Sequence, residues 1–214
     1  MTTIVPKTVT CAVCGRKSEV SIICSTNAFG SPDLDLRPPE MQRSTMGLWV
    51  QECPYCHYAA SDLQEPYEGA ADRLTAADYL DCSKLEQLPE SARKFYRYHL
   101  LRLEQADWEG AFSGALWTAW CCDDAGDDKN AARLRCEALS ALERFVTSPE
   151  TDEQRWVLRA DLLRRTCQFD KLIAEYASFK SDEEILDQII AFQIELARAK
   201  DSGCHLVREA VEQK

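Results

Sequence analysis

Two Cys-x-x-Cys pairs constrain the fold of this chain more than any other feature of its sequence. Cys11 and Cys14 form the first pair, and Cys53 and Cys56 form the second. Two residues between paired cysteines let one tight turn present both sulfurs, and two such turns can surround one zinc ion tetrahedrally. The spacing therefore predicts a structural zinc site, with one ion per chain held by these four cysteines.

Two other interpretations of these cysteines remain open, namely a redox-active dithiol and a metal site that includes Cys24. A redox motif does not require two pairs, and neither pair has the βαβ context of thioredoxin-like proteins. Four cysteines also complete a tetrahedral shell, whereas a catalytic zinc keeps one position for water. Gly15 and His57 each follow a pair, where the backbone turns left-handed, and histidine tolerates that region better than most residues. We interpret His57 as a solvated turn residue rather than a ligand.

The first part of the chain has the composition of short strands joined by loops. Residues 7–10, 19–24 and 47–52 are the strand candidates, and the last of them leads directly into the second cysteine pair. Residues 25–45 contain several Pro, Gly and Ser residues, which predict a long irregular loop. Strands that end at cysteine turns are the architecture of a zinc ribbon, so we expect a zinc-ribbon-like domain over residues 1–62.

The loop also carries three acidic residues, Asp33, Asp35 and Glu40. We expect them to be solvated, with cation binding as the alternative.

From about residue 62 the hydrophobic period becomes helical. Gly126 and Cys167 occupy equivalent turn positions between successive helices, as in tetratricopeptide helix pairs, although their separation exceeds the usual period of about 34 residues. The sequence thus predicts an α+β fold, mainly α, in which the ribbon precedes a degenerate tetratricopeptide-like domain over residues 63–214; the alternative is a plain helical bundle. The expected helices cover residues 75–80, 89 onward, 108–125, 130–147, 152–166, 169–179 and 181–200.

Charge and composition limit the possible partners and compartments. The net charge of −11 lies in the helical part, because acidic and basic residues balance over residues 1–60. An acidic chain without a basic stretch is not typical of a nucleic-acid or membrane-surface binder. The longest charge-free apolar stretch runs only from Gly110 to Cys122, well short of the roughly 20 residues that span a bilayer. The segment 1–7 lacks the pattern of a secretion signal, so we expect a cytoplasmic protein whose thiols stay reduced.

Catalytic constellations are absent from the sequence, which favours a non-enzymatic protein. The chain has three histidines, and no nucleophile elbow, Walker loop or dinucleotide fingerprint is present. His99 lies among apolar and aromatic residues and is expected in the core. The remaining alternative is a thiol-dependent or zinc-dependent regulator or enzyme that uses the paired cysteines. Four further cysteines are expected to pack in the helical core: Cys121, Cys122, Cys136 and Cys167.

Stacked helix pairs leave a concave face that suits a peptide or a partner helix. The sequence therefore favours a protein-interaction module whose partner is a neutral or basic protein or peptide. Trp120 is the candidate contact residue, with burial in the core as the alternative. The oligomeric state is not predicted.

The block Cys53-Pro-Tyr-Cys56-His57-Tyr58-Ala59-Ala60 resembles the second cysteine turn of a bacterial family known only as domain of unknown function 2225. The first cysteine pair and the Asp33-x-Asp35 loop are similar to other segments of that family. This resemblance implies two cysteine turns followed by tetratricopeptide-like helices, and it implies no activity. His57 replaces the family's glycine.

Overall fold

The chain is mainly helical with two small antiparallel sheets, which confirms the predicted α+β class. The computed structural model describes residues 1–76, 79 and 85–212, so most of the helix predicted at residues 75–80 lies outside the described residues. The strands are β1 (Thr3–Thr10), β2 (Lys17–Ser25), β3 (Gln51–Glu52) and β4 (Ala59–Ala60). The helices are the 3-10 helix η1 (Arg43–Leu48), α1 (Ala70–Leu74), α3 (Glu90–Glu104), α4 (Trp108–Asp124), α5 (Asp128–Leu142), α6 (Glu153–Arg165), α7 (Phe169–Tyr176), α8 (Glu184–Arg198) and α9 (Val207–Val211).

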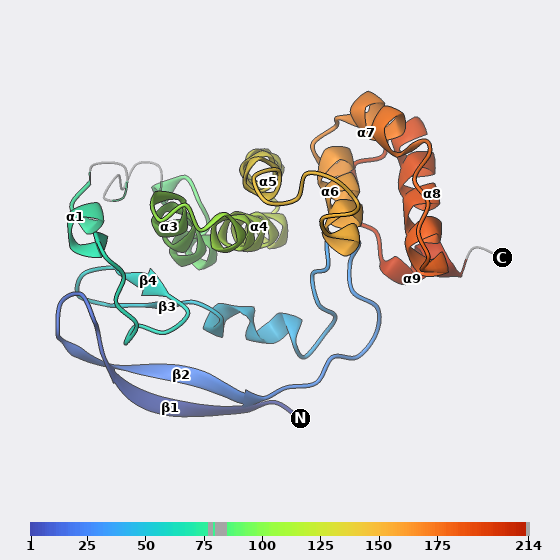
Figure 1. The fold of residues 1–214 in the computed structure, drawn as a ribbon. Coiled ribbons are helices and arrows are strands. Elements are labelled where there is room, and N and C mark those ends of the chain that lie inside the picture. Colours follow the sequence, from blue (N-terminus) through green and yellow to red (C-terminus); the bar gives the residue numbers. More distant parts are fainter. Residues whose placement is uncertain (77–78, 80–84, 213–214) are drawn as a thin grey trace.

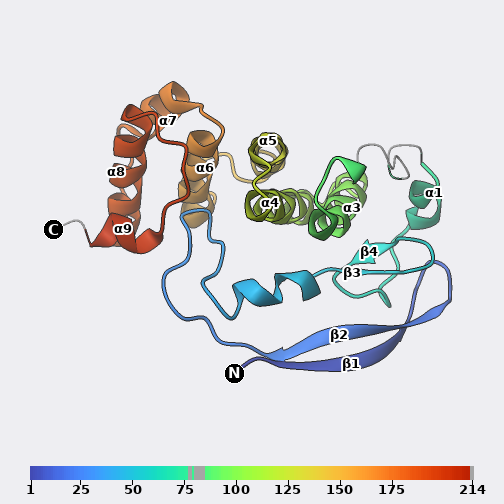
Figure 2. The ribbon, with the colours of Figure 1, turned by 180° about the vertical axis from the view of Figure 1, so that it is seen from behind.

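The elements form two helical groups above a base of β structure (Figure 1). The β1–β2 ribbon runs along one side, and η1 and the short β3–β4 hairpin lie between this ribbon and α3, α4 and α5. The helices α6, α7, α8 and α9 form the second group, beside α5. Figure 2 shows from behind how residues 26–42 leave β2, reach α6 and return to η1. The N-terminal segment is thus in contact with both helical groups.

Aspartate side chains cap the N-terminal ends of three of the long helices. Asp107 accepts a hydrogen bond from the Gly110 amide at 2.9 Å, at the start of α4. Asp127 and Asp152 make the equivalent contacts at the starts of α5 and α6. Such a cap satisfies one of the amides that a helix leaves unpaired at its first turn, and it contributes about 1 kcal/mol. The turn that the sequence predicts between α4 and α5 is therefore confirmed.

The two turns predicted to be equivalent share one backbone conformation. Gly126 has φ 70° and Cys167 has φ 59°, and each residue follows the C-terminal end of a helix. The amide after each of them donates back to a carbonyl in the last helical turn, from Asp127 to Cys122 and from Gln168 to Leu163. These hydrogen bonds form a Schellman motif at the C-terminal end of each helix. The tetratricopeptide-like array itself stays a prediction.

Several predicted boundaries are wrong, and two of them have a clear local cause. The strand expected over residues 47–52 is limited to Gln51–Glu52, because the preceding residues continue η1 and the Trp49 amide donates to the Met46 carbonyl. The helix expected over residues 130–147 ends at Leu142. There the chain changes to shorter-range bonds, with the Phe145 amide donating to the Leu142 carbonyl at 3.1 Å.

The helices α3 and α4 approach each other closely at Gly114. A Cβ atom added there would lie 2.9 Å from the backbone nitrogen and from the Cα atom of His99. Because that neighbour is backbone, it cannot move aside cheaply. A glycine inside a helix costs about 1 kcal/mol relative to alanine, so the close approach must outweigh this loss.

We expect Gly114→Ala to destabilise the protein by about 1–3 kcal/mol, the usual range for overpacking a core. Chemical denaturation followed by the helical circular-dichroism signal measures this change. Gly47→Ala is the matched control, since no atom lies within 4 Å of a Cβ added at Gly47. Equal stability of the two variants would show that α3 and α4 are not in close contact at Gly114.

Residues 26–42 are irregular as expected, but two of their three acidic side chains are buried, and Glu40 is the exposed one. Asp33 is 3% exposed and Asp35 is 2% exposed, so the expectation of a solvated loop is wrong for both. The loop pairs with the segment before α9, where the Leu34 amide donates to the His205 carbonyl at 2.9 Å and the Val207 amide donates to Pro32. Buried backbone needs such partners. The loop is therefore an integral part of the helical core, while the division at residues 1–62 and 63–214 stays a prediction.

Candidate metal centre

The four predicted ligands lie at the tips of two hairpins. Cys11 and Cys14 occupy the turn between β1 and β2, and Cys53 and Cys56 occupy the turn between β3 and β4. In each turn the amide four residues after the first cysteine donates to that cysteine's carbonyl at 2.9 Å. In each turn the first cysteine's amide donates to the carbonyl five residues later, at 2.9 Å for Cys11 and 2.8 Å for Cys53. Two unrelated stretches of sequence thus fold into the same cysteine turn.

Both turns require a left-handed residue after the second cysteine. Gly15 has φ 71° and His57 has φ 60°, as the sequence predicts for these two positions. Glycine adopts this conformation without steric cost, whereas histidine is strained there. The His57 side chain points away from the sulfurs to Glu52, with 2.7 Å between Nδ1 and Oε1. His57 is therefore a turn residue and not one of the clustered ligands.

The four sulfur atoms all lie within 4.8 Å of one another. The Sγ atoms of Cys11 and Cys56 are 3.7 Å apart, and those of Cys14 and Cys53 are also 3.7 Å apart. A zinc ion with four sulfurs at about 2.3 Å requires sulfur–sulfur distances of about 3.8 Å. A disulfide requires about 2.05 Å, so the pairs are not bonded. The cluster has the dimensions of a tetrahedral metal site.

Burial makes the cluster unfavourable for thiolates without a cation. Cys53 is fully buried, Cys11 is 1% exposed, and Cys14 is exposed. Burial, together with the neighbouring thiols, raises the pKa of Cys56, and burial raises the pKa of Cys11. Negative sulfurs held this close repel one another, and a divalent cation removes that repulsion. The four cysteines can therefore hold a metal ion, and the donor set fits a soft one.

Among the residues that the structure describes, no other cysteine joins this cluster. Cys24 is exposed on β2, so the structure does not support a metal site that includes it. Cys121 and Cys122 are buried in α4 as predicted, whereas Cys136 and Cys167 are exposed, which corrects the expectation that they pack in the core. In the part of the chain that the structure describes, every cysteine is free of disulfides. The loop acids form no second group with metal-binding geometry among these residues.

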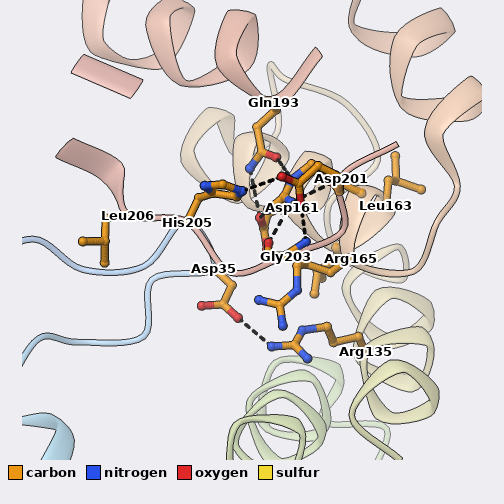
Figure 3. A network of polar contacts seen from close by, with 12 residues as sticks. Asp35, Arg135, Asp161, Leu163, Arg165, Gln193, Asp201, Gly203, His205 and Leu206 are labelled. Carbon is orange, nitrogen blue, oxygen red and sulfur yellow. Dashed lines mark hydrogen bonds and ion pairs between the residues drawn. The ribbon is translucent and has the colours of Figure 1, made fainter. Parts of the chain in front are cut away.

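Trp120 belongs to the interior. Its side chain is 4% exposed, and its indole N–H donates to the Asp35 carboxylate at 2.7 Å. The same Asp35 oxygen accepts a hydrogen bond from Arg135 at 3.2 Å, as Figure 3 shows. An indole whose only polar atom is already bonded and buried does not offer a contact to a partner. The structure therefore favours the interpretation that Trp120 is a core residue over the interpretation that it contacts a partner.

A second buried network joins α6, α8 and the segment before α9. Arg164 is fully buried and donates to Asp161 at 2.7 Å and to the Gly203 carbonyl at 2.8 Å. Gln193, on α8, accepts from Arg164 and donates to Asp161. Figure 3 shows Gln193, Asp161 and Gly203 close to Asp201 and His205. The sequence did not reveal this network, because its members are ordinary helical residues with no motif between them.

His99 is a core histidine, as the sequence predicts. It is 1% exposed, and its Nδ1 donates to the Ala111 carbonyl at 2.7 Å. It thereby joins α3 to α4 and does not meet a nucleophile.

Comparison with known proteins adds no further assignment: no family model matches the chain, and neither a curated protein nor a solved structure is detectably similar to it. Among the helices in the described ranges, none is both long and apolar enough to cross a bilayer.

Proposed function

We propose that Cys11, Cys14, Cys53 and Cys56 hold one zinc ion as a structural centre. The observation that carries this proposal is the pair of 3.7 Å sulfur–sulfur distances between two separate hairpins. Zinc prefers four tetrahedral ligands in structural sites and binds thiolate strongly. Four thiolates complete that shell and leave no position for a reacting water. The centre would join the two hairpins, each of which is too small to be stable alone.

The protein that results is a zinc-containing interaction module, in which the helices supply the binding surface. Three facts support this role over thiol chemistry: the first cysteine of each turn is buried, the turns lack a helix that would activate a thiolate, and the helices stack side by side. The tetratricopeptide-like arrangement and the resemblance to domain of unknown function 2225 are part of the same proposal. Thiolates that bind zinc must stay reduced, so the module would act in a reducing compartment such as the cytoplasm.

Thiol reactivity separates the structural role from a redox role. Reaction of other thiols with the reagent is first reduced by replacing five cysteines outside the two Cys-x-x-Cys pairs with serine, namely Cys24, Cys82, Cys136, Cys167 and Cys204. In the zinc-loaded protein we expect the four cluster thiols to react slowly with a disulfide reagent, and chelation should speed their reaction together with release of one zinc. Fast reaction of the cluster thiols while zinc stays bound would favour the thiol-dependent regulator instead.

A further inference from the structure

A groove of ≈ 570 Å³ lies between α3 and α5 and ends at the first residue of α4. Its α3 wall is apolar and aromatic, and its α5 wall carries small and charged side chains. Tyr96 and His99 stack with ring centroids 5.9 Å apart on the α3 wall. The size and the mixture of aromatic and polar lining are those of a recognition site. The lining includes Tyr96, His99, Trp108, Arg133, Glu137 and Arg144.

Two arginines mark the ends of this groove, each above an aromatic ring. The Arg133 guanidinium lies 5.5 Å from the centroid of Tyr96, and the Arg144 guanidinium lies 5.1 Å from that of Trp108. Arg133 is in α5 and Arg144 follows its C-terminal end, so the helical rise puts them on the order of 16 Å apart. Stacking on a ring holds a guanidinium in place without using its N–H groups. The Arg133 N–H groups also donate to Asn130 and Glu137.

The two arginines differ in their ionic partners. Arg133 pairs with Glu137, one turn further along α5. Arg144 is exposed, and no carboxylate in the described ranges pairs with it. Glu137 also lies 3.3 Å from the buried His99 Nε2, so this one carboxylate is shared between two groups. The lining of the groove carries two arginines and one carboxylate, so its local charge is net positive, in a chain whose net charge is −11.

The local charge decides which partner fits. Exposed charges more than about 8 Å apart are largely screened at physiological salt, so the distant acids of this chain do not set the potential inside the groove. An apolar floor with a guanidinium at each end is complementary to an apolar segment with a carboxylate at each end. The overall charge favours a neutral or basic partner, but the groove itself favours an acidic one.

We infer that the groove between α3 and α5 binds an apolar segment of a partner protein, with acidic side chains at both ends that pair with Arg133 and Arg144. This inference rests on the proposed role as an interaction module. It names the surface and the chemistry of the partner.

The test selects peptides of about twelve residues from a random phage-displayed library on the full-length, zinc-loaded chain, because 16 Å corresponds to about eleven helical or five extended residues. We expect the enriched peptides to have an apolar centre between Asp or Glu residues. Binding of the synthetic peptides is then measured by fluorescence anisotropy. Exchanging their acidic residues for glutamine should weaken binding about tenfold, and added salt should weaken it further.

Charge reversal in the protein locates the site. Arg144→Glu should weaken binding about tenfold or more, and a peptide with lysine at the matching end should recover part of that loss. Lys129→Glu is the matched control, because it makes the same charge change near the start of α5, outside the groove. Ser140→Trp, at an exposed position of the α5 wall, should block the groove sterically.

The outcomes separate the two proposals. Peptides that bind equally well to wild type, Arg144→Glu and Ser140→Trp would show that the groove is not the binding site. The proposed role as an interaction module would still stand. Enrichment of basic peptides would contradict the inference that the partner segment carries acidic side chains. Failure to enrich any peptide would count against both the groove and the interaction role.

Discussion

Replacing Cys53 by serine is expected to abolish metal binding and to unfold both cysteine turns, while most of the helical circular-dichroism signal remains. Metal binding contributes on the order of 10 kcal/mol or more to the folding of small zinc domains. The Cys53 sulfur is fully buried and lies 3.7 Å from that of Cys14, so its loss opens the cluster from within. A serine hydroxyl is a weak ligand for zinc, and three thiolates do not close the shell.

Amide hydrogen exchange measures this effect segment by segment. In Cys53→Ser we expect protection to fall in β1, β2, β3 and β4 and to persist in α4 and α5, which bury their own apolar faces. Cys24→Ser is the control, because Cys24 is exposed and outside the cluster. Loss of protection throughout α4 and α5 would show that hairpins and helices form one cooperative unit, as the buried contacts of residues 26–42 allow.

The second large effect is expected from Arg164→Met. The arginine is fully buried, and its removal leaves the Asp161 carboxylate, 1% exposed, without its cationic partner. Breaking a buried ion pair from one side costs about 3–5 kcal/mol, because the remaining charge stays desolvated. The variant also loses the bonds that hold Gly203 and Gln193. We therefore expect a midpoint of denaturation far below that of the wild type.

Two further variants test whether the loss of stability comes from the buried ion pair. Arg165→Met removes the adjacent arginine, whose 3.4 Å contacts with Asp123 are longer, and it should cost much less. The double variant Asp161→Asn with Arg164→Met removes the uncompensated charge and should recover part of the lost stability. If Arg164→Met were no less stable than Arg165→Met, the buried network would not join α6 to α8 as described.

The metal centre was predictable because its signal is local. Each Cys-x-x-Cys pair fits one turn, and Gly15 with His57 marks the left-handed position that follows. The start of α4 was predicted at the right residue, and its Asp107 cap acts within three residues. The start of α5 was predicted two residues too late. Only the contact between the two turns is long-range, and the proposed zinc ion would explain why they meet.

The buried networks were not predictable, because they join residues that are far apart in the chain. Asp35 lies in a polar loop that has every local property of a solvated segment, yet it meets Trp120 and Arg135 in the core. Nothing near residue 35 encodes those partners. Burial of this carboxylate, together with the nearby charge of Asp161, raises the pKa of Asp35.

The groove arginines were hidden for a related reason. Arg133 and Arg144 look like ordinary solvated residues of an amphipathic helix. Their aromatic partners come from α3 and from the start of α4, and the sequence alone does not pair these elements.

Zinc content and coordination of the purified protein test the central claim most directly. Elemental analysis should find one zinc per chain, and X-ray absorption at the zinc edge should find four sulfur neighbours at about 2.3 Å. Cys53→Ser should contain no stoichiometric zinc. Full zinc occupancy in that variant, or a wild-type zinc coordinated by nitrogen and oxygen instead of four sulfurs, would contradict a centre built from Cys11, Cys14, Cys53 and Cys56.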